Sequence, residues 1–97
     1  MLTIEQARQL VAGVLETEGV DIEGGLALVE DATIAKPYGW VFFYNSRRYL
    51  ATMNHMDMLI GHGPIVVLAA SGEVIELGGG AGGSESKINR FEQERGL

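Results

Sequence analysis

The chain has 97 residues, of which 46% are hydrophobic and 7% aromatic, and it carries a formal net charge of −6 and no cysteine. This length suits one domain with one core, so we expect residues 1–97 to form a single domain. The absence of cysteine excludes a disulfide framework, thiol catalysis and Cys-containing zinc sites, and the acidic charge opposes binding to nucleic-acid phosphate.

The start of the chain and its hydropathy predict a cytoplasmic protein. Residues 1–6 contain neither the basic region nor the apolar run of a secretory signal peptide. No stretch reaches the roughly 18 consecutive apolar residues that a membrane-spanning helix needs. We therefore expect a cytoplasmic protein that does not engage a membrane.

Residues 3–19 are predicted to form a helix with one apolar face. Thr3 and Gln6 fit a capping box, in which each side chain bonds to the other residue's backbone amide. Gly19 is the expected end of the helix. Apolar residues recur between these points at helical spacing: Ala7, Leu10, Val11, Val14 and Leu15.

The strongest strand candidate covers residues 39–45, because it holds five consecutive β-favouring residues. Successive side chains of a strand point to opposite faces of the sheet. Alternation therefore gives two sets of side chains on opposite faces: Trp40, Phe42 and Tyr44, and Val41 with Phe43.

A second apolar run, residues 64–70, predicts another strand. Ser71 and Gly72 then read as a tight turn, and residues 73–77 as the next strand, so these two strands should form a hairpin.

Three segments before this hairpin carry weaker signals. Residues 26–30 are a weaker strand candidate, and residues 31–37 read as a turn or short connection. Residues 53–60 are ambiguous, and we interpret them as a loop containing a short helix.

A glycine-rich run at residues 78–83 precedes a predicted final helix. The run fits Gly-x-Gly-x-x-Gly, but only fourteen residues follow it, too few for the next strand of a dinucleotide-binding unit. We therefore predict a connection and no cofactor loop. Ser84 is expected to cap the helix, with Ile88 and Phe91 on its inner side.

The order of elements predicts an α+β fold, in which a small, mostly antiparallel sheet of about four strands packs with an N-terminal and a C-terminal helix. Residues 40–44 and 65–70 are apolar on both faces of their strands, which is unusual for an antiparallel sheet. Either the helices and the loop at 53–60 cover both faces, or one face is a docking surface.

No set of residues predicts catalysis or a bound cofactor. His55, Asp57 and His62 are close enough in sequence to suggest metal ligands, but they match no standard ligand spacing. No serine lies in Gly-x-Ser-x-Gly, and carboxylates such as Glu92 and Glu94 read as solvated helix charges. We expect no enzymatic activity, no metal and no cofactor.

Basic and aromatic residues lie together after the strongest strand candidate. Tyr44 and Tyr49 flank Arg47 and Arg48, a mixture that nucleic-acid platforms use. A turn after a buried strand has the same composition, and the acidic net charge favours that interpretation or a protein interface. Trp40 also has two interpretations, as a core residue or as an interface anchor.

Two segments carry a resemblance to a known family. Residues 39–46, followed by Tyr49 and Leu50, resemble the hallmark of the immunity protein 35 (YrhB-like) family. Residues 59–67 are similar to that family's Leu-x-Gly-Asn-Gly-Pro-Ile stretch, with His62 in place of the asparagine, and residues 71–74 are similar to its hairpin turn. The similarity extends over residues 3–91.

The resemblance implies a protein of a bacterial polymorphic toxin system, which binds and neutralises its cognate toxin by stoichiometric association. A second activity that it implies is that of a heat-stable, chaperone-like or general protein-interaction module. The sequence also allows a homodimer. The candidate partner-binding residues are Trp40, Tyr44, Arg47, Arg48, Tyr49 and His62.

Overall fold

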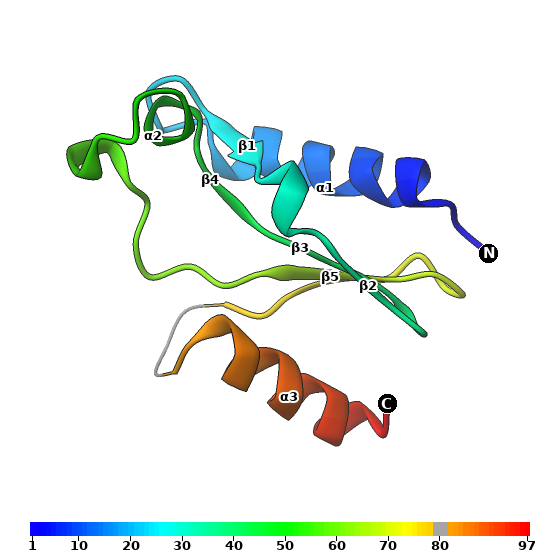
Figure 1. The fold of residues 1–97 in the computed structure, drawn as a ribbon. Helices are drawn as coiled ribbons and strands as arrows, with labels where there is room; N and C mark the ends of the chain where they lie inside the picture. Colours follow the sequence, from blue (N-terminus) through cyan, green and yellow to red (C-terminus); the bar gives the residue numbers. More distant parts are fainter. Residues whose placement is uncertain (79–81) are drawn as a thin grey trace.

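A four-stranded antiparallel sheet lies between two helices, so that the elements form three layers (Figure 1). The computed structural model describes residues 1–78 and 82–97. The helices are α1 (Ile4–Glu18), α2 (Arg47–Thr52) and α3 (Ser84–Arg95), with short 3₁₀ helices η1 (Glu30–Ala32) and η2 (His55–Asp57). The strands are β1 (Leu26–Leu28), β2 (Ile34–Lys36), β3 (Gly39–Phe42), β4 (Tyr44–Ser46), β5 (Ile65–Leu68) and β6 (Val74–Glu76).

The strands of the larger sheet pair in the order β2-β3-β5-β6, and each neighbouring pair is antiparallel. β1 and β4 form a separate antiparallel pair, which we call the β1–β4 ribbon. β3 and β4 come from the one strand predicted over residues 39–45, which is interrupted at Phe43. The predicted α+β class, the antiparallel sheet, and the hairpin of β5 and β6 are confirmed.

α1 begins and ends where the sequence predicts. The Thr3 hydroxyl accepts a hydrogen bond from the Gln6 amide at 3.2 Å, and the Gln6 side chain accepts one from the Thr3 amide at 2.9 Å. This capping box satisfies amides that a first helical turn leaves without partners. The helix ends at Gly19, whose amide donates to the Leu15 carbonyl. The buried side chains of the helix belong to the predicted inner face: Ala7, Val11 and Leu15.

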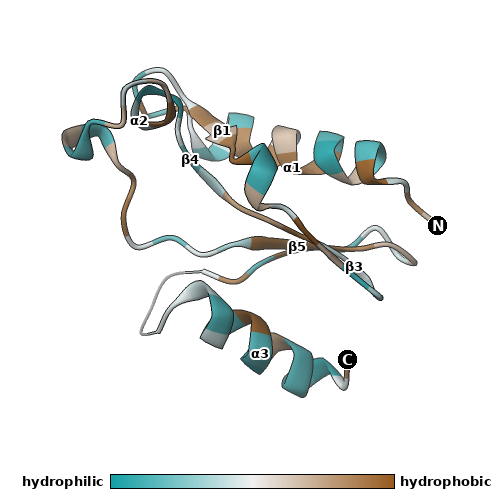
Figure 2. Ribbon diagram, viewed as in Figure 1, coloured by the Kyte–Doolittle hydropathy of each residue, from teal (hydrophilic) through white to brown (hydrophobic). Residues whose placement is uncertain are grey.

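Each face of the larger sheet is covered by one helix, which explains why its central strands are apolar on both sides. On one face, Phe42 and Ile65 are fully buried against α1. On the other, Val41 and Val66 pack with Ile88 of α3. In Figure 2 the brown part of α3 lies on the side that faces the sheet, and most of the rest of the helix is teal. The predicted alternation is confirmed, with Trp40, Phe42 and Tyr44 in the first cluster and Val41 and Phe43 in the second.

Residues 31–37, predicted to be a turn or connection, contain strand β2. β2 pairs with β3 across a two-residue turn at Pro37 and Tyr38. The prediction was wrong because β2 is a short edge strand with exposed Ile34 and Ala35, so its own sequence carries little strand pattern. The neighbouring edge of β3 supplies the hydrogen-bond partners that make it a strand.

Gly39 begins β3 at a position that requires glycine. Its φ is +155°, and a Cβ there would lie 2.0 Å from the Val67 carbonyl oxygen in β5. Gly63 is similarly constrained, because its Cβ would lie 2.2 Å from the Gly78 carbonyl oxygen. Both glycines therefore permit a close approach of backbone segments that any side chain would prevent.

Arg47 and Arg48, interpreted as a turn, begin helix α2. The Ser46 hydroxyl accepts a hydrogen bond from the Tyr49 amide at 3.0 Å and so caps this helix. Six residues are too few to show helical periodicity, which is why the sequence did not indicate it. The short helix predicted within residues 53–60 is confirmed as η2.

Ser84, expected to cap the last helix, is instead the first residue of α3. Gly83 occupies the cap position, where it offers no side-chain hydrogen bond. Glycine is tolerated there because water can satisfy the first amides. The predicted connection at 78–83 includes residues 79–81, which lie outside the described residues.

Candidate functional site

Of the six candidate partner-binding residues, three lie in or beside the core and three lie on α2. Tyr44 is only 7% exposed and packs in the core on the α1 side. His62 lies against it, with ring centroids 4.6 Å apart and its Nε2 2.7 Å from the Tyr44 carbonyl oxygen. Trp40 is half-buried beside the same core. The remaining three candidates lie on α2: Arg47, Arg48 and Tyr49.

Asn45 and Ser46 hold the segment after α2 against β4. The Asn45 Oδ1 accepts hydrogen bonds from the amides of Ser46 and Leu59, each at 2.8 Å. The buried Ser46 hydroxyl donates to the Asp57 carbonyl at 2.5 Å while it caps α2. This role was not predicted from the sequence, where its one signal is a pair of polar residues directly after an apolar strand.

The two arginines of α2 are engaged by the chain itself. Arg47 donates from Nε to the Gly24 carbonyl at 3.2 Å and from Nη2 to the Leu26 carbonyl at 3.3 Å. Arg48 forms an ion pair with Glu23 at 2.9 Å. Their guanidinium groups are therefore already bound to carbonyl and carboxylate oxygens of this chain.

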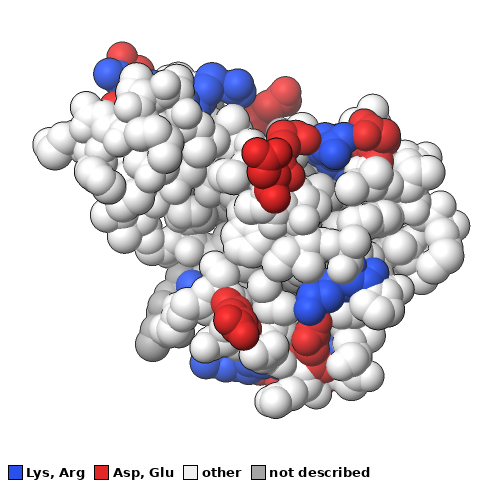
Figure 3. Space-filling view, viewed as in Figure 1, with Lys and Arg blue, Asp and Glu red and all other residues white. Residues whose placement is uncertain are grey.

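Residues 53–60, which we call the methionine segment, expose apolar side chains next to α2. Met53, Met56 and Ile60 are 63%, 91% and 77% exposed. In Figure 3, the part of the surface where this segment lies in Figure 1 is largely free of charged side chains. Methionine is unbranched and adapts to irregular surfaces, so the segment suits contact with a protein.

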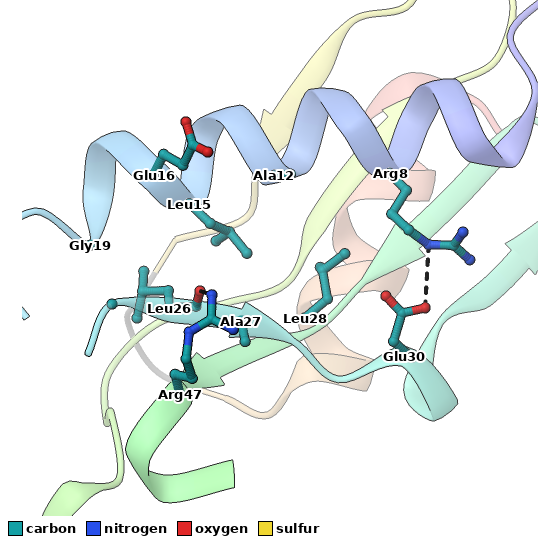
Figure 4. A pocket seen from close by; sticks show the side chains of 11 residues that line it. Arg8, Ala12, Leu15, Glu16, Gly19, Leu26, Ala27, Leu28, Glu30 and Arg47 are labelled. Carbon is teal, nitrogen blue, oxygen red and sulfur yellow. Dashed lines mark hydrogen bonds and ion pairs between the residues drawn. The ribbon is translucent and has the colours of Figure 1, made fainter. Parts of the chain in front are cut away.

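A groove of about 510 Å³ lies between α1 and β1, and we call it the α1–β1 groove. Its apolar lining comes from Ala12, Leu15, Leu26 and Leu28. Figure 4 shows the Arg8–Glu30 ion pair, 3.3 Å long, near one end of the groove and Arg47 near the other. No sequence pattern indicated this groove, because its two walls come from elements whose relative placement the sequence alone does not give. The remaining charged residue of the lining is Glu16.

The histidines do not gather with acidic residues in the part of the chain that is described. Within residues 1–78 and 82–97, no group of three or more His, Cys, Asp or Glu side chains is placed to hold a metal ion. His55 faces Tyr49 with ring centroids 6.3 Å apart, whereas His62 contacts Tyr44. Among the same residues, no helix is long and apolar enough to cross a membrane.

Two carboxylates with shifted pKa values lie away from α2. Burial raises the pKa of Glu76, and the neighbouring Glu18 raises it further. The pKa of Glu92 is lowered, first by the hydrogen bond that it accepts from the Tyr38 hydroxyl at 2.7 Å and then by Lys36 at 3.0 Å. Both groups lie where a helix meets the larger sheet, Glu76 near Glu18 of α1, and Glu92 of α3 against Tyr38 and Lys36.

The chain was compared with curated proteins, with solved structures and with models of protein families. No curated protein and no solved structure matches the chain. A model of the family described as immunity protein 35 matches residues 5–93. Within the described part of the chain, this range spans β1 to β6, α2, the methionine segment and nearly all of α1 and α3. The resemblance carried by residues 39–50 and 59–74 is thereby confirmed, and the chain belongs to the immunity protein 35 family.

Proposed function

We propose that this chain is an immunity protein that neutralises a cognate bacterial toxin by stoichiometric association, without catalysis. The observation that carries this proposal is the family match over residues 5–93. The described surface supports it, because the methionine segment and the α1–β1 groove both offer apolar area to a partner. Stoichiometric binding needs such a surface and no reactive group.

The interface is proposed to centre on α2. Its residues Arg47, Arg48 and Tyr49 lie between the methionine segment and the β1–β4 ribbon, so a bound protein could contact all three regions. Tyr44 and His62 would act indirectly, by supporting β4 from the core. The net charge of −6 would speed encounter with a basic partner through long-range attraction.

A co-purification experiment tests the proposal. The tagged chain is expressed with a catalytically inactive form of the toxin encoded beside its gene, and the complex is sized by chromatography with light scattering. We expect a complex of fixed stoichiometry, and we expect cells that express this chain to survive the active toxin. Failure to bind or to protect would contradict the proposal.

The exposed methionine segment favours a second candidate function, that of a heat-stable, chaperone-like or general protein-interaction module. Under this alternative the chain should suppress aggregation of several unrelated heated proteins. A double substitution of Met53 and Met56 to serine should then weaken the suppression for all of them. Binding to a single partner, with no effect on unrelated proteins, would exclude the alternative.

A further inference from the structure

β1 has one free edge, and two hydrogen bonds identify which of its backbone groups face that edge. The Val29 amide donates to the Phe43 carbonyl at 2.8 Å, and the Arg47 amide donates to the Gly25 carbonyl at 3.0 Å. Both bonds follow the register that pairs Leu28 with Tyr44 in the β1–β4 ribbon. Bonded and non-bonded positions alternate along an antiparallel pair, so the backbone groups of the even-numbered residues, Leu26 and Leu28, point away from β4.

The two outward-facing positions differ in how they are covered. The Leu26 carbonyl accepts the hydrogen bond from Arg47 Nη2, and Gly19 lies so close to the Leu26 amide that a Cβ on Gly19 would approach its nitrogen to 3.1 Å. The N–H and C=O of Leu28 take part in no hydrogen bond within the described residues. Leu28 therefore presents one donor and one acceptor at the edge of a strand, the pair that an added strand engages.

The α1–β1 groove runs beside this edge and offers space for side chains. Leu28 itself contributes to the groove lining, opposite Ala12 and Leu15 of α1. Ala12 is exposed and small, so this part of the helix leaves room for an apolar side chain. Glu16, one turn along α1, belongs to no ion pair among the described residues, so it offers an unneutralised carboxylate to an incoming cation.

We infer that an extended segment of the cognate toxin occupies the α1–β1 groove and adds a strand to the free edge of β1. The inference rests on the proposed function. The segment's backbone bonds to the N–H and C=O of Leu28, an apolar side chain lies against Ala12 and Leu15, and a basic side chain meets Glu16. We favour a single extended segment over a second copy, because α1 flanks the β1 edge in every copy and a bare strand needs less space beside it than a strand that carries its own helix.

Filling the groove tests the inference. Ala12→Trp places a large side chain in the groove, and Gln9→Trp places the same side chain at an exposed α1 position outside the groove lining. Affinity for the inactive cognate toxin is measured by calorimetry, and folding by thermal melting. We expect Ala12→Trp to raise Kd by about tenfold or more with an unchanged Tm, whereas Gln9→Trp should stay within about twofold of the original chain.

A charge substitution and a hydrogen-exchange measurement test the two specific contacts. Glu16→Lys should weaken binding more than Glu94→Lys, which changes the net charge equally at an exposed site on α3. The Leu28 amide should exchange rapidly in the free chain and become protected in the complex, because the added strand accepts its hydrogen bond.

The outcomes separate failure of this inference from failure of the proposed function. If the toxin binds the Ala12→Trp chain with the original affinity, or binds while the Leu28 amide still exchanges rapidly, the groove is not the binding site and the proposed function stands. If the original chain binds no toxin, the proposed function and this inference both fail. If the original chain is a dimer that Ala12→Trp dissociates, the occupant is a second copy and the inference is overturned.

Discussion

β3 and β4 come from one apolar run of the sequence, yet they have different neighbours. β3 lies between β2 and β5, with a helix over each face of its sheet. Among the described residues, β4 pairs with no strand other than β1, and the methionine segment and the free edge of β1 lie on either side of it. Fully buried side chains are thus concentrated around β3. The exposed methionines and the free backbone groups of Leu28 lie around β4. We expect substitutions in the first region to change stability, and exposed substitutions in the second to change binding.

The largest expected effect comes from the centre of β3. Phe42→Ala should lower the free energy of unfolding by about 3–5 kcal/mol, because the fully buried ring would leave a cavity. Met56→Ala, in the methionine segment, should change it by less than about 0.5 kcal/mol, because that side chain is 91% exposed. Urea denaturation measures both. Similar losses for the two variants would show that the regions do not differ as described.

A smaller loss is expected at the end of β4. Ser46→Ala removes the hydroxyl that binds the Asp57 carbonyl and the Tyr49 amide, which should cost about 1–3 kcal/mol. Amide exchange within residues 53–60 should become faster, because the segment loses its attachment to β4. Ser71→Ala removes an exposed hydrogen bond to the Glu73 amide and serves as the control. An effect of Ser71→Ala as large as that of Ser46→Ala would contradict the buried role.

The contact between the β2–β3 turn and α3 should contribute less to stability than the Ser46 hydroxyl does. Tyr38→Phe removes the hydroxyl that donates to Glu92, so the free energy of unfolding should fall by about 0.5–1.5 kcal/mol. The same variant should raise the pKa of Glu92 toward its ordinary value, since this hydrogen bond is the main cause of its lowering.

The sign of the pH dependence follows from that lowered pKa. The stabilisation by ionised Glu92 is present above the unfolded-state pKa and is lost as the pH falls through the lower folded-state pKa. Carboxyl titration by NMR and unfolding across this acidic range measure both consequences. Tyr49→Phe is the control, because the Tyr49 hydroxyl makes no hydrogen bond within the described residues. An unchanged Glu92 titration in Tyr38→Phe would exclude the assigned cause.

The smallest expected effect concerns Glu76 of β6, which lies near Glu18 of α1. Here the substitution should stabilise the fold, whereas the preceding substitutions should destabilise it. The raised folded-state pKa means that the folded state favours the protonated form of Glu76. The stability that this form contributes is fully present below the unfolded-state pKa and is lost as the pH rises through the folded-state pKa. Glu76→Gln should therefore increase Tm slightly at pH 7, and the increase should vanish below about pH 4. Glu94→Gln, on the exposed side of α3, is the matched control. A decrease of Tm at pH 7 would refute the assigned shift.

Much of the fold was predictable because its signals are local. The capping box of Thr3 and Gln6 fixes the start of α1, and the alternation within residues 40–44 assigns side chains to two faces. β2 was missed because three residues with two exposed side chains carry no pattern of their own. α2 was missed because its residues are recognisable as a helix only once Ser46 caps them.

The candidate site was predictable only in outline. Arg47, Arg48 and Tyr49 were identified as a group and do lie together on α2. Burial separates Tyr44 and His62 from that surface, and burial depends on how β4 packs against α1. The α1–β1 groove has no signature in the sequence, because it exists only where two distant elements face each other.

The hydrogen bond from Arg47 to the Leu26 carbonyl has a consequence for a concentrated solution of the folded chain. Uncapped strand edges allow identical molecules to stack into fibrils, since each added copy extends the ladder. At the edge of β1, Arg47 occupies the outward carbonyl of Leu26, so among the described residues of this strand a neighbouring copy finds a free donor and acceptor only at Leu28. One residue can hold a single segment whose side chains also fill the groove, but it is too short to support a growing ladder of copies. We therefore expect Arg47 to limit stacking along the β1 edge.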